Sequence, residues 1–174
     1  MPCTAKKYEI RRPELTIHGK PVVRHVLTTA ELASMIQEAG IRFADLDPVS
    51  MDLPMGFASG AGIVFGHAGG VSEAVARYVA GAPGAGGTHV LDFTDEVPEG
   101  GIRTATLTAG DQTIRVTSVQ GLANAKKVVR EILDGKRETD IVEIMACPGG
   151  CVGGAGQPIS YDPDIRSKRA QGLQ

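Results

Sequence analysis

Tryptophan is absent from the 174 residues of this chain, and aromatic residues make up only 4% of it. Cysteine is scarce too, and its three copies cannot all pair as disulfides within one chain. No apolar run reaches the roughly 18 residues of a membrane span, and the first residues lack the apolar segment of a signal peptide. We therefore expect a cytoplasmic protein without a membrane span, whose cysteines bind a metal or are simply buried.

An excess of charge of one sign is missing as well. The 18 Lys and Arg residues nearly balance 20 Asp and Glu residues, for a formal net charge of -2. This balance gives no broad attraction to nucleic acid or to an anionic membrane, so neither is expected as a partner. The hydrophobic fraction of 42% is typical of a globular protein, and we expect residues 1–174 to form one domain.

In the first half of the chain, the spacing of apolar residues alternates between strand and helix patterns. The β-branched run over residues 22–27 predicts a strand, and Thr28 and Thr29 are candidate N-caps for a helix that ends at Gly40. A second helix is predicted from about Gly70. Its expected apolar face consists of Val71, Ala74, Val75, Tyr78 and Val79.

The second half adds strands around one more helix. Residues 88–98 can form a short strand, residues 102–121 predict a hairpin that turns at Ala109–Asp111, and a helix follows as far as Gly135. A mostly apolar strand is expected over residues 140–146. This alternation predicts an α/β fold with a parallel or mixed sheet flanked by helices, and ligands of such sheets gather at the carboxyl ends of strands.

Two cysteines stand directly after that last strand, in the sequence Cys147-Pro-Gly-Gly-Cys151. The two glycines allow a tight turn whose N–H groups can point at thiolate or sulfide, which favours an iron–sulfur site. Zinc more often uses a spacing of two residues or a mixture of Cys and His. Buried, unreactive cysteines explain the pattern equally well. A reactive thiol is a third interpretation, best placed at Cys3 because Lys6 and Lys7 follow it.

Two segments of the chain carry a family resemblance. The letters MPCTAKKYE at residues 1–9 and EIMACPGGCVGGAGQP at residues 143–158 resemble, in order and separation, the second and third active-site signatures of the iron-only (FeFe) hydrogenases. The segments VLTTAELASMIQEAGI, SGAGIVFGHAGGVSEAVAR and VQGLANAKKVVREILDGK are similar to that family as well. The resemblance extends over essentially the whole chain. It implies one lobe of the hydrogenase catalytic domain, namely its carboxyl-terminal part.

This resemblance also implies a set of cofactor-binding residues. The family's H-cluster joins a 4Fe-4S cubane, through a cysteine sulfur, to a diiron unit that carries carbon monoxide and cyanide. Cys3 and Cys147 would ligate the cubane, and Cys151 would ligate it while bridging to the diiron unit. Lys6 would donate a hydrogen bond to an iron-bound cyanide. The residues that would pack around the cofactor are Met1, Met145 and Phe65.

The same residues have plainer interpretations. Taken without the family, Lys6 is a solvated surface lysine, and Met145 and Phe65 are core residues.

The segment FGHAGGVSEA also departs from the family at three positions, where relatives commonly have Ala, Thr and Met. These positions are His67, Ala68 and Ser72.

Several parts of the family pattern are missing. The family's cubane has four cysteine ligands, whereas this chain has three cysteines, and the first signature with its tryptophan is absent. We therefore expect a partner, either the missing amino-terminal lobe or another hydrogenase subunit. The resemblance further implies ferredoxin or another electron carrier, and maturation proteins. In the family a methionine stands internally where this sequence begins, so we expect the chain to be part of a larger catalytic domain.

Three functions are compatible with these residues. The first is part of a hydrogenase that interconverts dihydrogen with protons and electrons, inactive as an isolated chain. The second is a noncatalytic iron–sulfur protein of the hydrogenase-like family, which serves cluster assembly and binds no diiron unit. The third is a metal-free folded fragment. Lys6 and the intact sequence MACPGGC favour the first.

Overall fold

A mixed four-stranded sheet forms the centre of the computed structural model, which describes residues 3–50, 52, 61–79, 91–96, 100–109 and 112–173. The sheet has the order β3 (Thr94–Asp95), β4 (Ile102–Ala109), β5 (Gln112–Gln120) and β6 (Ile141–Met145). The first three strands are antiparallel neighbours, whereas β6 runs parallel to β5. This confirms the predicted hairpin strands and the strand before the cysteine pair; the turn at 110–111 lies outside the described residues.

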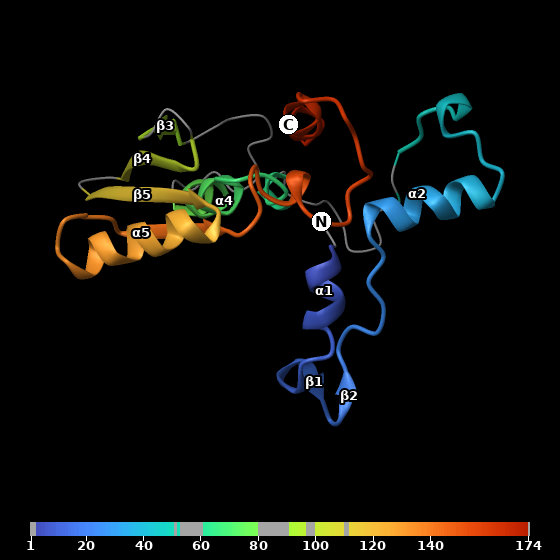
Figure 1. Ribbon diagram of the computed structural model, residues 1–174, viewed down its shortest axis with the longest axis horizontal. Helices are drawn as coiled ribbons and strands as arrows, with labels where there is room; N and C mark the ends of the chain where they lie inside the picture. The colour runs from blue at the N-terminus through green and yellow to red at the C-terminus, as the bar shows by residue number, and fades with distance from the viewer. Residues whose placement is uncertain are drawn as a thin grey trace.

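Two helices cover opposite faces of the sheet, α4 (Gly70–Val79) and α5 (Leu122–Leu133), and both begin where the sequence predicts (Figure 1). Because side chains alternate between faces along a strand, Ile102 and Ala105 of β4 point to opposite sides, and each belongs to a separate core cluster. The α4 cluster contains Ala76, Leu91, Ala105, Leu107 and Val116, and the α5 cluster contains Ile102, Val119, Ala125 and Val128. No helix in the described ranges is long and apolar enough to cross a membrane.

The buried face of α4 differs from the one that its apolar spacing predicts. The helix buries Glu73 and Arg77, while Val71, Val75, Tyr78 and Val79 on the expected apolar face are exposed, Tyr78 by 78%. Burial of the two charges is possible because Arg77 Nε donates to Glu73 Oε1 at 2.8 Å, and the Leu91 N–H donates to Glu73 Oε2 at 3.0 Å. The predicted face was therefore wrong, and an apolar face of α4 is left uncovered.

The amino-terminal part also differs from its prediction. It consists of α1 (Thr4–Glu9), the two-residue strands β1 (Thr16–Ile17) and β2 (Lys20–Pro21), and α2 (Thr29–Glu38). Residues 22–27 form no strand, because the hairpin pairing stops at Pro21 and no other described strand lies alongside them; β-branched side chains cannot supply that neighbour. The helix prediction is confirmed: Thr28 caps α2, and Glu31 completes a capping box.

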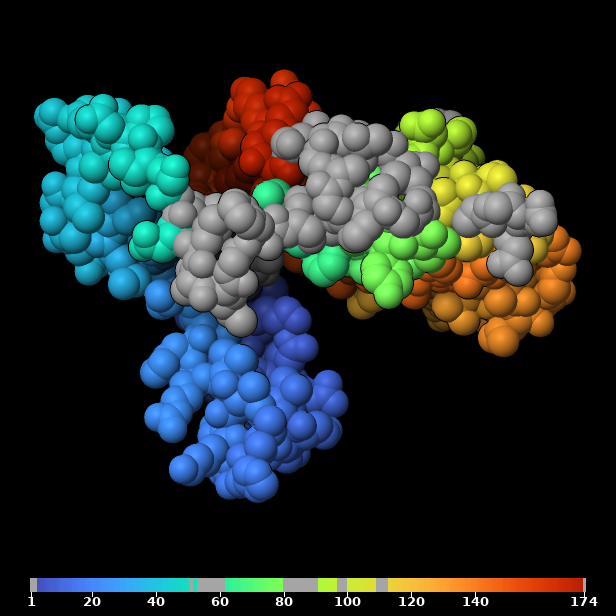
Figure 2. Space-filling view, turned by 180° about the vertical axis from the view of Figure 1, so that it is seen from behind, coloured from blue at the N-terminus to red at the C-terminus, as the bar shows by residue number. Residues whose placement is uncertain are grey.

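Large apolar side chains are exposed along the amino-terminal part. No residue of α2 is buried, and Leu32 and Met35 are about half exposed, while Phe43 in the following turn η2 (Phe43–Asp45) is 71% exposed. Figures 1 and 2 show α1 with its hairpin and α2 projecting from the body of the molecule in different directions. Monomeric globular proteins rarely expose contiguous apolar surface of this extent.

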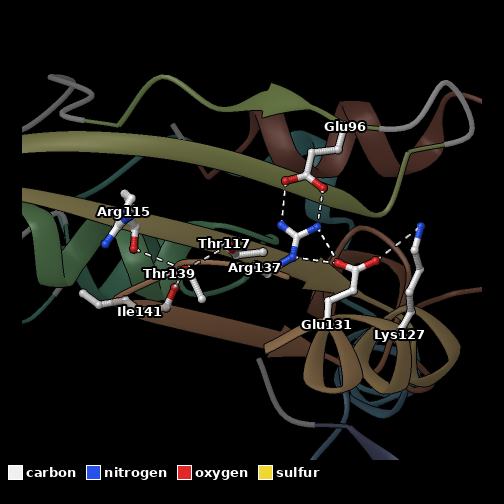
Figure 3. Close-up of polar contacts among 8 residues, drawn as sticks. All are labelled: Glu96, Arg115, Thr117, Lys127, Glu131, Arg137, Thr139 and Ile141. Atoms are coloured by element: carbon white, nitrogen blue, oxygen red, sulfur yellow. Dashed lines mark hydrogen bonds and ion pairs between the residues drawn. The ribbon is translucent and has the colours of Figure 1, made fainter. Parts of the chain in front are cut away.

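A bridging arginine ties the end of the sheet to α5 (Figure 3). Arg137 donates from both terminal nitrogens to Glu96 at 2.7 Å, and from Nε to Glu131 at 2.9 Å. These hydrogen bonds raise the pKa of Arg137 and lower that of Glu96. Arg137, which lies between α5 and β6, thereby connects Glu96 after β3 with Glu131 in the last turn of α5.

Replacement of Glu96 by glutamine is expected to lower the free energy of unfolding at pH 7 by about 1.5 kcal/mol, since a charged bidentate pair is weakened. The hydrogen bond from Arg137 holds the pKa of Glu96 below its ordinary 4.5, so this stabilisation is present above the unfolded-state pKa and is lost as pH falls through the folded one. The unfolding free energies of the two proteins, measured in urea, should converge as pH falls below the folded-state pKa of Glu96, which itself lies below 4.5. Glu138→Gln, which removes an exposed partner of Arg115, is the control. A pH-independent effect of Glu96→Gln would contradict the prediction.

Candidate functional site

The Cys147–Cys151 loop lies at the carboxyl end of β6, as the sequence predicts. Gly149 and Gly150 have φ values of 80° and 86°, and the Gly150 N–H closes a tight turn onto the Cys147 carbonyl at 3.0 Å. The loop is attached to the sheet because the Gly149 N–H donates to Gln120 Oε1, at the end of β5, at 2.6 Å. Cys151 then begins the short helix η3 (Cys151–Gly153).

A second segment, residues 65–69 after α3 (Ala61–Val64), is bonded directly to the cysteine loop. The Ala68 N–H donates to the Gly149 carbonyl at 3.2 Å, and the Val152 N–H donates to the Gly66 carbonyl at 3.0 Å. The two backbones are so close that a Cβ on Gly150 would lie 2.6 Å from the Ala68 nitrogen. The close approach explains why glycine stands at this position.

Glu143 fixes that segment to β6, and sequence reasoning did not assign this residue a role. Its buried carboxylate accepts the Gly69 N–H at 2.5 Å and the Ser72 N–H at 2.8 Å, at the start of α4. A negative charge is favourable there because the first N–H groups of a helix have no partner within it. The sequence feature that could have indicated this role is an acidic residue inside a strand that is expected to be buried.

The three positions expected from the sequence to depart from the family lie in this segment and at the start of α4. Ala68 and Ser72 make their contacts to the loop and to Glu143 through backbone N–H groups, which any residue except proline supplies. His67 places Nδ1 3.0 Å from the Ala68 carbonyl oxygen. The substitutions therefore leave the backbone framework of the site in place.

Cys3 is brought to the same place from the other end of the chain. The Thr4 N–H donates to the Ala155 carbonyl at 3.2 Å, and the Cys3 Cα lies 3.2 Å from where a Cβ would stand on Gly156. The pKa of Lys6 is raised, first by its hydrogen bond to Glu9, and further by the negative charges of that carboxylate and of the Cys3 and Cys151 thiolates. One ammonium group therefore lies within electrostatic reach of both cysteines.

The structure thus gathers Cys3, Lys6, Cys147 and Cys151, each half-buried or exposed, at one end of the sheet. Met145, half-buried, is the last residue of β6, and Phe65, 46% exposed, begins the segment bonded to the loop. Met1 lies outside the described residues. Among the described residues no group of three His, Cys, Asp or Glu side chains could hold a single metal ion, so this sulfur set does not make a simple zinc-type centre.

Residues 1–155 match the family model described as "Iron only hydrogenase large subunit, C-terminal domain". This chain belongs to the iron-only hydrogenase family. The NADP-reducing hydrogenase subunit HndD of Solidesulfovibrio fructosivorans is 39% identical over 99% of the chain. A solved variant of the FeFe-hydrogenase HydA1 from Chlamydomonas reinhardtii superposes over all of it with a TM-score of 0.76 and 35% identity.

The relatives that match this chain are much longer than it is, and some of them are not named as hydrogenases. The chain covers 30% of HndD and 51% of the HydA1 structure, so it spans about a third to a half of the relatives it matches. The probable cytosolic Fe-S cluster assembly factor oxy-4 of Caenorhabditis elegans is 34% identical over 93% of the chain and 36% of that protein. The relatives that this chain matches therefore include a hydrogenase subunit and a probable Fe-S cluster assembly factor.

Proposed function

We propose that the chain is part of an iron-only hydrogenase, and that the complete protein interconverts dihydrogen with protons and electrons at an H-cluster. One observation carries the proposal: Cys3, Cys147 and Cys151 converge from the two ends of the chain beside Lys6. When bound, the 4Fe-4S cubane and diiron unit would supply the redox chemistry and the site of hydrogen binding.

The residues of this chain fit such a group. Thiolates are the ligands that iron–sulfur clusters prefer, and a cubane takes one thiolate per iron, so separated cysteines suit it better than they suit a single ion. Cys3 and Cys147 would ligate the cubane, and Cys151 would ligate it and bridge to the diiron unit. A Cβ on Gly154 would lie 3.5 Å from Cys147 Sγ, so glycine at this position keeps side-chain atoms away from that sulfur.

The remaining site residues would serve the diiron unit. Lys6 would exchange its ion pair with Glu9 for a charge-assisted hydrogen bond to an iron-bound cyanide. Met1, Met145 and Phe65 would limit the access of water, which tunes the potential of a metal site. With three cysteines, the chain leaves one cubane ligand to come from elsewhere.

We further propose that the amino-terminal lobe of the catalytic domain, or another hydrogenase subunit, completes the site. The exposed apolar residues of α2 and α4 support this partner, because they offer surface that another folded unit could bury. Ferredoxin or another electron carrier would exchange electrons with the cluster, and maturation proteins would insert the diiron unit. We expect the complete protein to act in the cytoplasm.

A noncatalytic iron–sulfur protein of cluster assembly is the second candidate. The similarity to oxy-4 favours it, and it would need only the cubane-binding cysteines. A metal-free fragment is the third, since none of the cysteines belongs to either core cluster. Lys6 beside Cys151 favours the hydrogenase, because an ammonium group at the bridging cysteine is of use to a cyanide ligand and not to the cubane.

Anaerobic reconstitution with iron and sulfide tests the proposal. The chain would be treated alone and together with the separately produced preceding segment of HndD, and bound iron and sulfide would be measured. We expect a stoichiometric 4Fe-4S cluster only with the added segment. After maturation, infrared bands of iron-bound carbon monoxide and cyanide would identify a hydrogenase, and a cluster without these bands would favour the assembly protein. Absence of iron in both samples would contradict both functions.

A further inference from the structure

The last helix, α6 (Ile165–Gln171), lies against the cysteine loop from outside (Figure 1). Arg169, which is half-buried, donates from one terminal nitrogen to the Val152 carbonyl at 3.2 Å and from the other to the Pro158 carbonyl at 2.6 Å. Val152 directly follows Cys151. The guanidinium fork therefore connects the cysteine loop to the turn that follows it, which a single-headed lysine could not do.

A second arginine of α6 packs on the same loop. A Cβ on Gly153 would lie 3.3 Å from both Cδ and Nε of Arg166, and one on Gly149 would lie 3.6 Å from Cδ. Gly149 and Gly153 each stand two residues from one of the loop's cysteines. The guanidinium of Arg166 is thus held within about two residue lengths of both cysteine backbones.

Both arginines keep their positive charge available to the loop. Within the described ranges, neither Arg166 nor Arg169 forms an ion pair with a carboxylate. A different basic residue of α6 neutralises the nearby carboxylate: Lys168 pairs with Asp162, which also accepts the Asp164 N–H. Thiolate ligands are negative, and nearby charge and hydrogen bonding set the potential of an iron–sulfur cluster.

We propose that α6 is an arginine clamp on the cysteine loop, in which Arg169 holds the loop in its ligating shape and Arg166 raises the reduction potential of the bound cluster. The inference rests on the proposed function. It concerns residues outside the family match, which ends at residue 155. Both arginines are positioning or tuning residues, since they contact the loop and not the reacting atoms.

The first test needs no cluster. Hydrogen–deuterium exchange would be measured over residues 147–158 of the full chain, for wild type, Arg169→Gln and Arg169→Lys. We expect faster exchange in this segment for both variants, with the larger increase in Arg169→Gln, because loss of the two hydrogen bonds that restrain the segment lets its amide N–H groups open to solvent more often. Arg130→Gln, which removes an exposed arginine from α5, should leave the segment unchanged. Wild-type exchange in Arg169→Gln would overturn the clamp.

The second test measures the potential. Arg166→Gln, Arg166→Lys and Arg130→Gln would be reconstituted with the HndD segment and titrated with a reductant, followed by the signal of the reduced cluster in electron paramagnetic resonance. We expect a lower midpoint potential in Arg166→Gln alone, because a positive charge beside the cluster stabilises its reduced state. Equal iron content with equal potentials would overturn the inference while leaving the proposed function intact. Failure of every variant and of wild type to bind iron would overturn both.

Discussion

Gly150→Ala is expected to unfold the cysteine loop and to cost about 4 kcal/mol of stability. Two effects add. The residue has a φ of 86° and a ψ of -156°, a backbone conformation that is essentially restricted to glycine and costs an alanine about 1–3 kcal/mol. The added Cβ would also lie 2.6 Å from the Ala68 nitrogen and 2.7 Å from the His67 carbonyl carbon, which are backbone atoms that cannot rotate away. Urea unfolding would measure the loss, and iron uptake should disappear with it.

Gly135→Ala is the matched control for this prediction. Gly135, after α5, has a similar φ of 69°, but nothing lies within 4 Å of its Cβ position. Its replacement should therefore cost only the conformational strain, about 1–2 kcal/mol, and should leave iron uptake unchanged. Equal losses in the two variants would show that the close contact between the loop and residues 67–68 has no energetic weight.

Cys147→Ala is expected to abolish stoichiometric cluster binding in the complex with the HndD segment. The protein then offers two thiolates where the proposed function requires three, and neither neighbouring backbone groups nor Lys6 can replace a sulfur ligand. Iron and acid-labile sulfide after desalting would fall from about four of each per complex to a small residual amount.

The fold should survive that substitution, which separates loss of a ligand from loss of structure. Cys147 is half-buried and belongs to neither core cluster, so the unfolding midpoint of the metal-free variant should stay close to that of wild type. Ser118→Ala, a change at a buried site beside Glu143, serves as a control that perturbs the sheet while keeping all three thiols. Retention of a full cluster in Cys147→Ala would exclude Cys147 as a ligand.

Elements with strong local signals were predictable from the sequence. The alternating hairpin, the helix begun by Thr28 and Glu31, and the apolar strand ahead of Cys147 follow from spacing and capping, which depend on nearby residues. The cysteines could be proposed as site residues because the letters of the two motifs and their separation are visible in the sequence itself. Their convergence, in contrast, depends on backbone bonds such as the one between Thr4 and Ala155.

The errors arose where distant residues decide the outcome. Residues 22–27 have side chains suited to a strand, but a strand also needs a neighbouring strand, and none lies beside them in the described part of the chain. In α4 the apolar spacing indicated the wrong face, because Glu73 pairs with Arg77 and also accepts the Leu91 N–H, so both charges can be buried. Glu143 was missed for the same reason: its partners lie more than 70 residues earlier in the sequence.

The bonds from Thr4 to Ala155 and from Ala30 to Gly156 also determine when the site can exist. Each bond closes a loop of more than a hundred residues, and closing such a loop costs chain entropy before the contact can stabilise the fold. Such contacts therefore form late in folding. During synthesis, Cys3 leaves the ribosome long before Cys151 has been translated. The cysteine set therefore cannot assemble until Ala155 and Gly156 have been translated and have left the ribosome, and cofactor delivery has to follow that step.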